Sequence, residues 1–142
     1  MKLLSNICLL LYALVQLQSS AWAETTPPKA ILPPEVHEIA PGQVERYLVD
    51  HVDTLIIDVR TEEERRSRGY ILNSLPLDYF HGQKTVDALV KLDKTKPCIV
   101  YGAIGGRAKF IAIEMHKLGF KNILLIRGGF NAWTADGQAI AR

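Results

Sequence analysis

This chain contains few cysteines and has a small net charge. Its 142 residues include two cysteines, Cys8 and Cys98, and the formal net charge at pH 7 is +2. Such a weak charge does not favour binding to nucleic acid or to an acidic membrane surface. The chain also lacks internal repeats, so a repeat architecture is not expected.

Metal-binding and common nucleophile motifs are missing as well. No two of the four histidines have the spacing of metal ligands. These histidines are His37, His51, His81 and His116. No His-x-x-x-His, paired-cysteine or serine-nucleophile motif is present. We therefore expect no metal and no other cofactor, and we expect the histidines to lie at the surface.

The first 23 residues have the pattern of a secretory signal peptide. Lys2 supplies the basic start, residues 7–15 form an apolar centre, and Ala21-Trp22-Ala23 is a small-x-small cleavage site. A membrane anchor is the alternative interpretation. It needs about 20 apolar residues, and polar side chains within residues 16–20 interrupt this run.

Cleavage after Ala23 would place the mature chain, starting at Glu24, outside the cytoplasm. A bacterial periplasm is the simplest location, and no membrane association is expected after cleavage. Because Cys8 would be removed, Cys98 would be the only thiol, and no internal disulfide bond could form.

Residues 24–34 are predicted to form a proline-rich linker, followed by a single domain over residues 35–142. The linker contains four of the seven prolines, which fix φ and supply no N–H group, so an extended spacer is expected. The composition of the chain, 48% hydrophobic and 23% charged, is ordinary for a globular protein with one core.

Within the domain, apolar runs alternate with amphipathic segments. Strands are predicted at residues 36–39, 54–59, 75–77, 97–101 and 123–126. Helices are predicted from Pro41, from Thr61, over residues 83–92 and 107–118, and around Trp133. This alternation predicts an α/β fold in which a parallel β-sheet of about five strands is flanked by helices on both faces.

Two of these helices carry specific expectations. Thr61 and Glu64 have capping-box spacing, and the Glu62/Arg66 and Glu64/Arg68 pairs lie at i,i+4 on what we expect to be a solvated face. The helix over residues 83–92 is expected to turn Val86, Leu89 and Val90 toward the core.

The segment after the strand over residues 97–101 is the candidate binding loop. It consists of Gly102, Ala103, Ile104, Gly105, Gly106 and Arg107. Ligands of parallel sheets bind beyond the carboxyl ends of the strands. Three glycines allow a tight turn with exposed N–H groups, and the next helix adds its positive N-terminal end. The loop is therefore either a small anion cradle with Arg107 at its rim or a plain strand-to-helix turn.

Several segments together resemble a single-domain rhodanese, a sulfur-transfer fold, over about residues 36–137. The resemblance rests on Asp58-Val59-Arg60, Gly69-Tyr70-Ile71, the 102–107 loop and residues 127–133, Arg-Gly-Gly-Phe-Asn-Ala-Trp. The family has a Cys-x-x-x-x-Arg loop of the same length, in which Gly102 takes the place of the cysteine. The resemblance also implies that Asp58, Arg60 and Trp133 support the fold. Tyr70 stands where such domains often have histidine.

The resemblance implies that the family's nucleophile is missing. In rhodaneses the cysteine thiolate attacks the outer sulfur of a donor such as thiosulfate, becomes a persulfide and passes the sulfur to cyanide or a thiol. Covalent catalysis needs a nucleophilic atom, and Gly102 has no side chain. A related dual-specificity phosphatase would need a cysteine and a loop one residue longer. We therefore expect no catalytic residue in the loop.

The sequence is compatible with two functions, one of a binding domain and one of an enzyme. In the first, the domain is inactive as a sulfurtransferase and uses residues 102–107 to bind a small anion, a sulfur-containing ligand or a protein partner. In the second, it is an active sulfurtransferase that uses a non-standard residue such as Cys98. That thiol lies roughly 13 Å along the strand from Gly102, and we expect it to pack in the core.

Overall fold

The computed structural model describes residues 31–142. The predicted signal peptide and most of the predicted linker therefore lie outside the described residues. Within the described residues, no helix is both long and apolar enough to cross a membrane.

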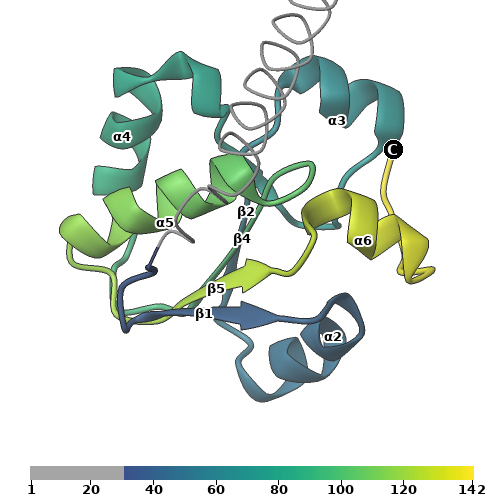
Figure 1. Ribbon diagram of the computed structural model, residues 1–142, viewed down its shortest axis with the longest axis horizontal. Coiled ribbons are helices and arrows are strands. Elements are labelled where there is room, and N and C mark those ends of the chain that lie inside the picture. The colour runs from purple at the N-terminus through teal and green to yellow at the C-terminus, as the bar shows by residue number, and fades with distance from the viewer. Residues whose placement is uncertain (1–30) are drawn as a thin grey trace, which may run out of the picture. The chain divides into compact units, whose positions relative to one another are not determined.

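Strands and helices alternate along the domain (Figure 1). The strands are β1 (Val36–Ile39), β2 (Leu55–Asp58), β3 (Leu75–Pro76), β4 (Cys98–Tyr101) and β5 (Ile123–Ile126). The α-helices are α2 (Pro41–Asp50), α3 (Glu62–Arg68), α4 (Gln83–Val90), α5 (Gly106–Lys117) and α6 (Gly129–Ala135), and a 3-10 helix, η2, spans Tyr79–His81. Each predicted strand is present, with bounds that differ by at most one residue at either end.

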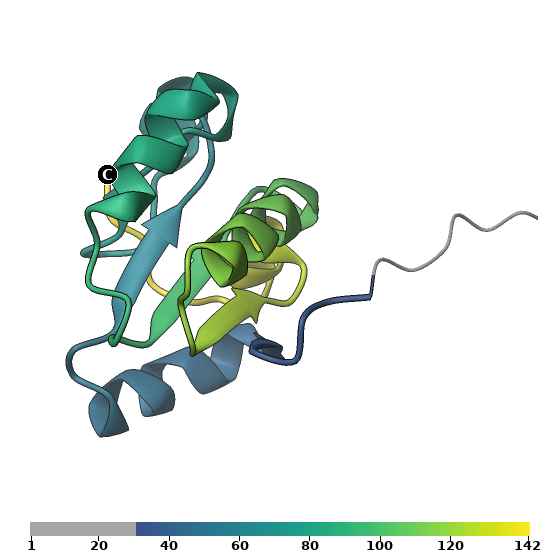
Figure 2. The ribbon, with the colours of Figure 1, turned by 90° about the vertical axis from the view of Figure 1, so that its left-hand side faces the viewer.

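The five strands form one parallel sheet in the order β1-β5-β4-β2-β3. Both faces of the sheet are covered (Figures 1 and 2). One core cluster lies on the side of α4 and α5 and includes Ile57, Val100 and Met115. The other lies on the side of α2 and α6 and includes Val44 and Trp133. The predicted α/β fold, with helices on both faces, is therefore confirmed.

The order of the strands within the sheet places β4 in the centre, where all four of its residues are buried. Such a strand needs a continuous apolar run, which Cys98-Ile99-Val100-Tyr101 provides. The carboxyl end of β4 leads directly into residues 102–105 and then into α5, so the candidate loop lies at the middle of the sheet's carboxyl edge.

Helix α4 differs from the sequence prediction. Its buried residues are Thr85 and Leu89, whereas Val90 is 48% exposed. Thr85 faces inward because its hydroxyl donates a hydrogen bond to the carbonyl of Asp78. The expectation that Val90 packs into the core was wrong, because the inward face of the helix carries Thr85 and Leu89.

Candidate functional site: the β4–α5 loop

The loop between β4 and α5 is fastened to the start of α6. The N–H of Phe130 donates to the carbonyl of Gly102 at 2.8 Å, and the N–H of Asn131 donates to that of Ala103 at 3.0 Å. A Cβ on Gly129 would lie 2.6 Å from the Gly102 oxygen, which is closer than packed atoms approach. Glycine is therefore required at position 129 for this contact.

The fastened loop leaves donors available for a ligand. Within residues 31–142, the N–H groups of Ala103, Ile104 and Gly105 donate no hydrogen bond to protein. Gly105 has φ = +117°, a left-handed conformation that directs the chain into α5. The first N–H groups of α5 lack partners within the helix, as in any α-helix. These groups can hydrogen-bond an anion without a charged side chain.

Gly102, in contrast, does not need to be glycine for conformational reasons. Its φ lies outside the positive region. A Cβ at this position would meet the amide nitrogen of Ala108 at 3.6 Å, Cγ2 of Val59 at 3.6 Å and Cβ of Arg107 at 3.7 Å. All three are ordinary van der Waals distances. The backbone can therefore accept a small side chain that lies against the N-terminal turn of α5.

Arg107 is engaged by Glu64 from α3. Its NH1 group donates to Oε2 of Glu64 at 2.7 Å and its NH2 group to Oε1 at 2.6 Å. The pair holds the pKa of Glu64 at about 2, mainly through the hydrogen bond from Arg107, and the same bond raises the pKa of Arg107. The rim of the loop therefore carries a neutralised ion pair.

This contact corrects the predicted surface pairing on α3. Glu64 pairs with Arg107 across the fold instead of with Arg68, and Arg66 pairs with Glu63 at i,i+3 instead of with Glu62. The predicted capping box is confirmed, because Thr61 and Glu64 exchange side-chain hydrogen bonds with each other's N–H groups. The sequence pattern predicted the local contact but not the long-range one.

Asp58 and Arg60 form a buried network behind the loop. The Asp58 carboxylate is fully buried and accepts hydrogen bonds from the Arg60 and Arg65 guanidinium groups and from the Tyr101 hydroxyl at 2.6 Å. Burial and the neighbouring Asp58 raise the pKa of Tyr101 to about 12, so its hydroxyl remains a donor. Two arginines thus share one carboxylate, which fixes the end of β4 next to Gly102.

The aromatic ring of Phe130 closes this network. The Arg60 guanidinium carbon lies 3.7 Å from the centre of the Phe130 ring, a cation–π contact that partly offsets the burial of charge. Trp133, one helical turn further, is 5% exposed, and its Nε1 donates to the carbonyl of Ala139 at 2.9 Å. These contacts are consistent with structural roles for Arg60 and Trp133.

Arg65 is the residue of this network that sequence reasoning missed. It lies within a charged run on α3, yet it is only 8% exposed and it donates to Asp58 and Ser74. Its guanidinium also stacks over the ring of Tyr70 at 4.4 Å. The charged run itself offers no signal for this burial, because it does not show that Asp58, seven residues earlier, is a buried carboxylate facing α3.

Comparison with known proteins connects this site to sulfur transfer. Residues 41–136 match the family described as "Rhodanese-like domain". The chain is 33% identical over 88 residues to "Thiosulfate sulfurtransferase GlpE" of Coxiella burnetii, covering 62% of this chain and 78% of that protein. It is also 27% identical over 105 residues to a "Sulfurtransferase" of Allochromatium vinosum, covering 74% of this chain and 94% of that one.

This chain belongs to the rhodanese-like domain family. The solved structure of the polysulfide-sulfur transferase homodimer from Wolinella succinogenes is similar to it, with a TM-score of 0.63 and 25% identity, covering 75% of this chain and 79% of that one. Family, fold and the sulfurtransferase relatives thus agree with the resemblance derived from the motifs.

The thiol of the rhodanese-like domain is remote from the loop. Cys98 begins β4, is fully buried in the cluster with Ile111 and Met115, and contacts the carbonyl of Lys96. Burial raises the pKa of Cys98 to about 12, so it stays protonated at neutral pH. A protonated, buried thiol is a poor nucleophile.

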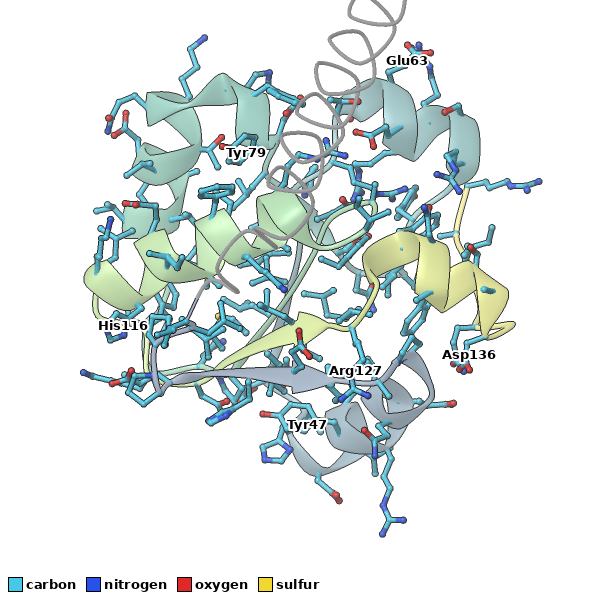
Figure 3. The ribbon with its side chains drawn as sticks, viewed as in Figure 1. Tyr47, Glu63, Tyr79, His116, Arg127 and Asp136 are labelled. Atoms are coloured by element: carbon cyan, nitrogen blue, oxygen red, sulfur yellow. The ribbon has the colours of Figure 1, made fainter. Side chains whose placement is uncertain are left out.

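The histidines do not gather into a site. Within residues 31–142, no group of three or more potential ligands is arranged to hold a metal ion. His116 lies on the outer side of α5 (Figure 3). Its Nδ1 atom is 3.0 Å from Oε2 of Glu35. His51 stacks on Tyr47 with ring centres 4.0 Å apart. These contacts assign local packing roles to both side chains.

Proposed function

We propose that this rhodanese-like domain does not transfer sulfur and instead binds a small anion or a sulfur-containing ligand through residues 102–107. One observation carries the proposal. At the carboxyl end of β4, where the family has its thiolate, Gly102 leaves a space beside the N-terminal turn of α5 and the donors of residues 103–105. A binding loop therefore remains without a nucleophile.

The proposal includes the location of the protein. Its first 23 residues have the pattern of a signal peptide, so the domain would act outside the cytoplasm, in a bacterial periplasm. There the ligand would be a small anion or sulfur compound that diffuses freely. A protein that docks on residues 102–107 is the alternative ligand.

Anion binding is tested by titration. Adding thiosulfate, sulfite, sulfate or phosphate to the isotope-labelled protein should shift the backbone amide signals of residues 103–107, because these N–H groups would donate to the anion. Backbone donors alone imply weak binding, with a Kd on the order of 1 mM. Amide signals of β1, on the far edge of the sheet, serve as the control.

If none of the four anions moves the signals of residues 103–107, the anion form of the proposal is wrong. The remaining form of the proposal is that a protein partner docks on this loop. Capture of that partner by the intact protein should then require residues 102–107. The side chain of Ile104 is 71% exposed, so the substitution Ile104→Ala would test that dependence without disturbing the core.

Sulfur transfer through Cys98 is the competing function, and a thiosulfate-to-cyanide assay decides it. We expect no thiocyanate above background, because the buried Cys98 has a pKa near 12. We also expect Cys98→Ser to behave like the unmodified protein. Thiocyanate production that is lost in Cys98→Ser would show that Cys98 carries the sulfur and would overturn the proposal.

A further inference from the structure

The charge of Arg107 is held in place from several sides. Both of its terminal nitrogens donate to Glu64, at 2.7 and 2.6 Å, and its guanidinium carbon lies 5.5 Å from the centre of the Phe80 ring. Its side chain is 21% exposed. A bidentate pair with a stacking contact restricts the arginine strongly, so Arg107 is not free to reach a ligand in the loop.

Glu64 is itself fixed at the start of α3. Its Oε2 accepts a hydrogen bond from the N–H of Thr61 at 3.0 Å, and its own N–H donates to the Thr61 hydroxyl at 3.1 Å. Releasing Arg107 by rotating Glu64 away would therefore also break the helix cap. The ion pair is thus a built feature of the fold, formed between two elements that meet at the loop.

A second carboxylate adds to the negative charge near Arg107. The side chain of Asp78 is 15% exposed and accepts a hydrogen bond from the N–H of Phe80 at 2.8 Å. Its charge, after that of Glu64, contributes to raising the pKa of Arg107. The Nε2 atom of His81 lies 3.8 Å from Oδ2 of Asp78. The side chains at this end of the loop therefore present no net positive charge to an anion.

The rim beside this ion pair is apolar. Ile104, at the tip of the loop, is 71% exposed, and Phe80, which contacts Arg107, is 68% exposed. Tyr79 connects Phe80 to Phe110, with ring centres 5.4 and 6.2 Å apart, and lies between α4 and α5 (Figure 3). Exposed apolar side chains on the loop and beside Arg107 suit a ligand with an apolar part.

We propose that the loop selects a singly charged organic anion with an apolar group, and that Glu64 sets this selectivity by cancelling the charge of Arg107. This inference rests on the proposed function, because it assumes that residues 102–107 bind anions. Backbone donors stabilise one negative charge, and the apolar rim holds the organic part. A doubly charged inorganic anion gains no side-chain cation, and Glu64 and Asp78 oppose its second charge, so it binds more weakly than a singly charged organic anion.

Glu64→Gln tests the charge part of the inference. Glutamine also fits the third position of a capping box, so the start of α3 is kept while the charge of Arg107 is left without its counter-ion. Benzenesulfonate and sulfate are the probes, titrated at constant ionic strength and followed through the amide signals of residues 103–107. Coulomb energy scales with ligand charge. We therefore expect about tenfold tighter sulfate binding and about threefold tighter benzenesulfonate binding.

Three further variants isolate the cause. Glu63→Gln removes an equal charge from the outer side of α3 (Figure 3), where Glu63 pairs with the exposed Arg66, and should leave both affinities unchanged. The double variant Glu64→Gln/Arg107→Gln restores the neutral rim and should return both affinities to those of the unmodified protein. Ile104→Ala should weaken benzenesulfonate by about threefold and leave sulfate unchanged.

The outcomes distinguish failure of anion binding by residues 102–107 from failure of the role assigned to Glu64. If neither probe shifts the signals of residues 103–107 in any variant, the proposed anion-binding function fails. If the unmodified protein binds sulfate at least as tightly as benzenesulfonate, or if Glu64→Gln leaves their ratio unchanged, anion binding stands and the role of Glu64 is wrong. A larger change for sulfate than for benzenesulfonate supports the inference.

Discussion

Gly102→Cys is expected to give this protein thiosulfate sulfurtransferase activity. The new Cβ would meet Ala108, Val59 and Arg107 at 3.6–3.7 Å, so the side chain fits without movement of the backbone. The thiol would lie against the N-terminal turn of α5 and the free donors of residues 103–105. Such surroundings favour the thiolate and lower a cysteine pKa below its usual value near 8.5.

The expected reaction is the one that the family performs. The thiolate attacks the outer sulfur of thiosulfate, the sulfur–sulfur bond of the donor breaks, and sulfite leaves with the bonding electrons. Cyanide then takes the sulfur from the persulfide as thiocyanate and regenerates the thiolate. Because a nucleophile is worth several orders of magnitude in rate, we expect a rise of at least about a hundredfold over the unmodified protein.

Ala103→Cys is the matched control for this variant. It places a thiol in the same loop, one residue further on, at a half-buried position and away from the space beside Ala108. We expect little transfer from it, and we expect the rate of Gly102→Cys to be unaffected by the additional change Cys98→Ser. A Gly102→Cys thiol that alkylates with an ordinary pH dependence and transfers no sulfur would show that the loop no longer has the geometry of the family.

The strands and the loop were predictable because their signals are local. A buried parallel strand needs a run of apolar residues, and residues 54–59, 97–101 and 123–126 each supply one. The Thr61/Glu64 cap was predictable for the same reason, since both partners lie within one turn. Membership of the rhodanese-like family followed from short motifs whose order along the chain matched a known pattern.

The charge of the site was not predictable from the sequence, because its determinants are distant. Arg107 seemed to add a positive charge at the rim, whereas Glu64, 43 residues earlier, neutralises it. The burial of Arg65 was missed for a different reason: its partner Asp58 is only seven residues away, but the charged run on α3 does not show which of its cations turns inward. Periodicity assigns faces to a helix, but it does not identify a buried carboxylate that can compensate an inward-facing cation.

Other long-range contacts explain why the loop would keep its shape without catalytic chemistry. Gly129 permits the hydrogen bonds from α6 to Gly102 and Ala103, and Asp58 holds Tyr101 at the preceding position. None of these contacts involves a side chain at position 102. The geometry of the loop therefore does not depend on the residue that occupies the nucleophile position.

Asp58→Asn should destabilise the protein by about 3–5 kcal/mol, the cost of leaving buried cations without their counter-ion. The Asp58 carboxylate is fully buried and compensates both Arg60 and Arg65. The asparagine side chain has nearly the same shape but carries no charge, and its amide would face donors. This loss is a large fraction of the stability of a typical domain. Urea unfolding of the unmodified protein and of Asp58→Asn measures this loss, provided that the two m-values agree.

Two further variants distinguish loss of charge compensation from general sensitivity. Glu63→Gln breaks an ion pair in which both side chains are at least 70% exposed, and should cost less than about 1 kcal/mol. Arg65→Met removes the second cation and leaves Asp58 paired with Arg60, so it should cost less than Asp58→Asn. In combination with Asp58→Asn, it should cost less than the sum of the two single changes. Additive effects would contradict a shared carboxylate, because the two changes would then act independently. Equal losses for Arg65→Met and Asp58→Asn would also contradict it, because only Asp58→Asn is expected to leave two buried cations without their counter-ion.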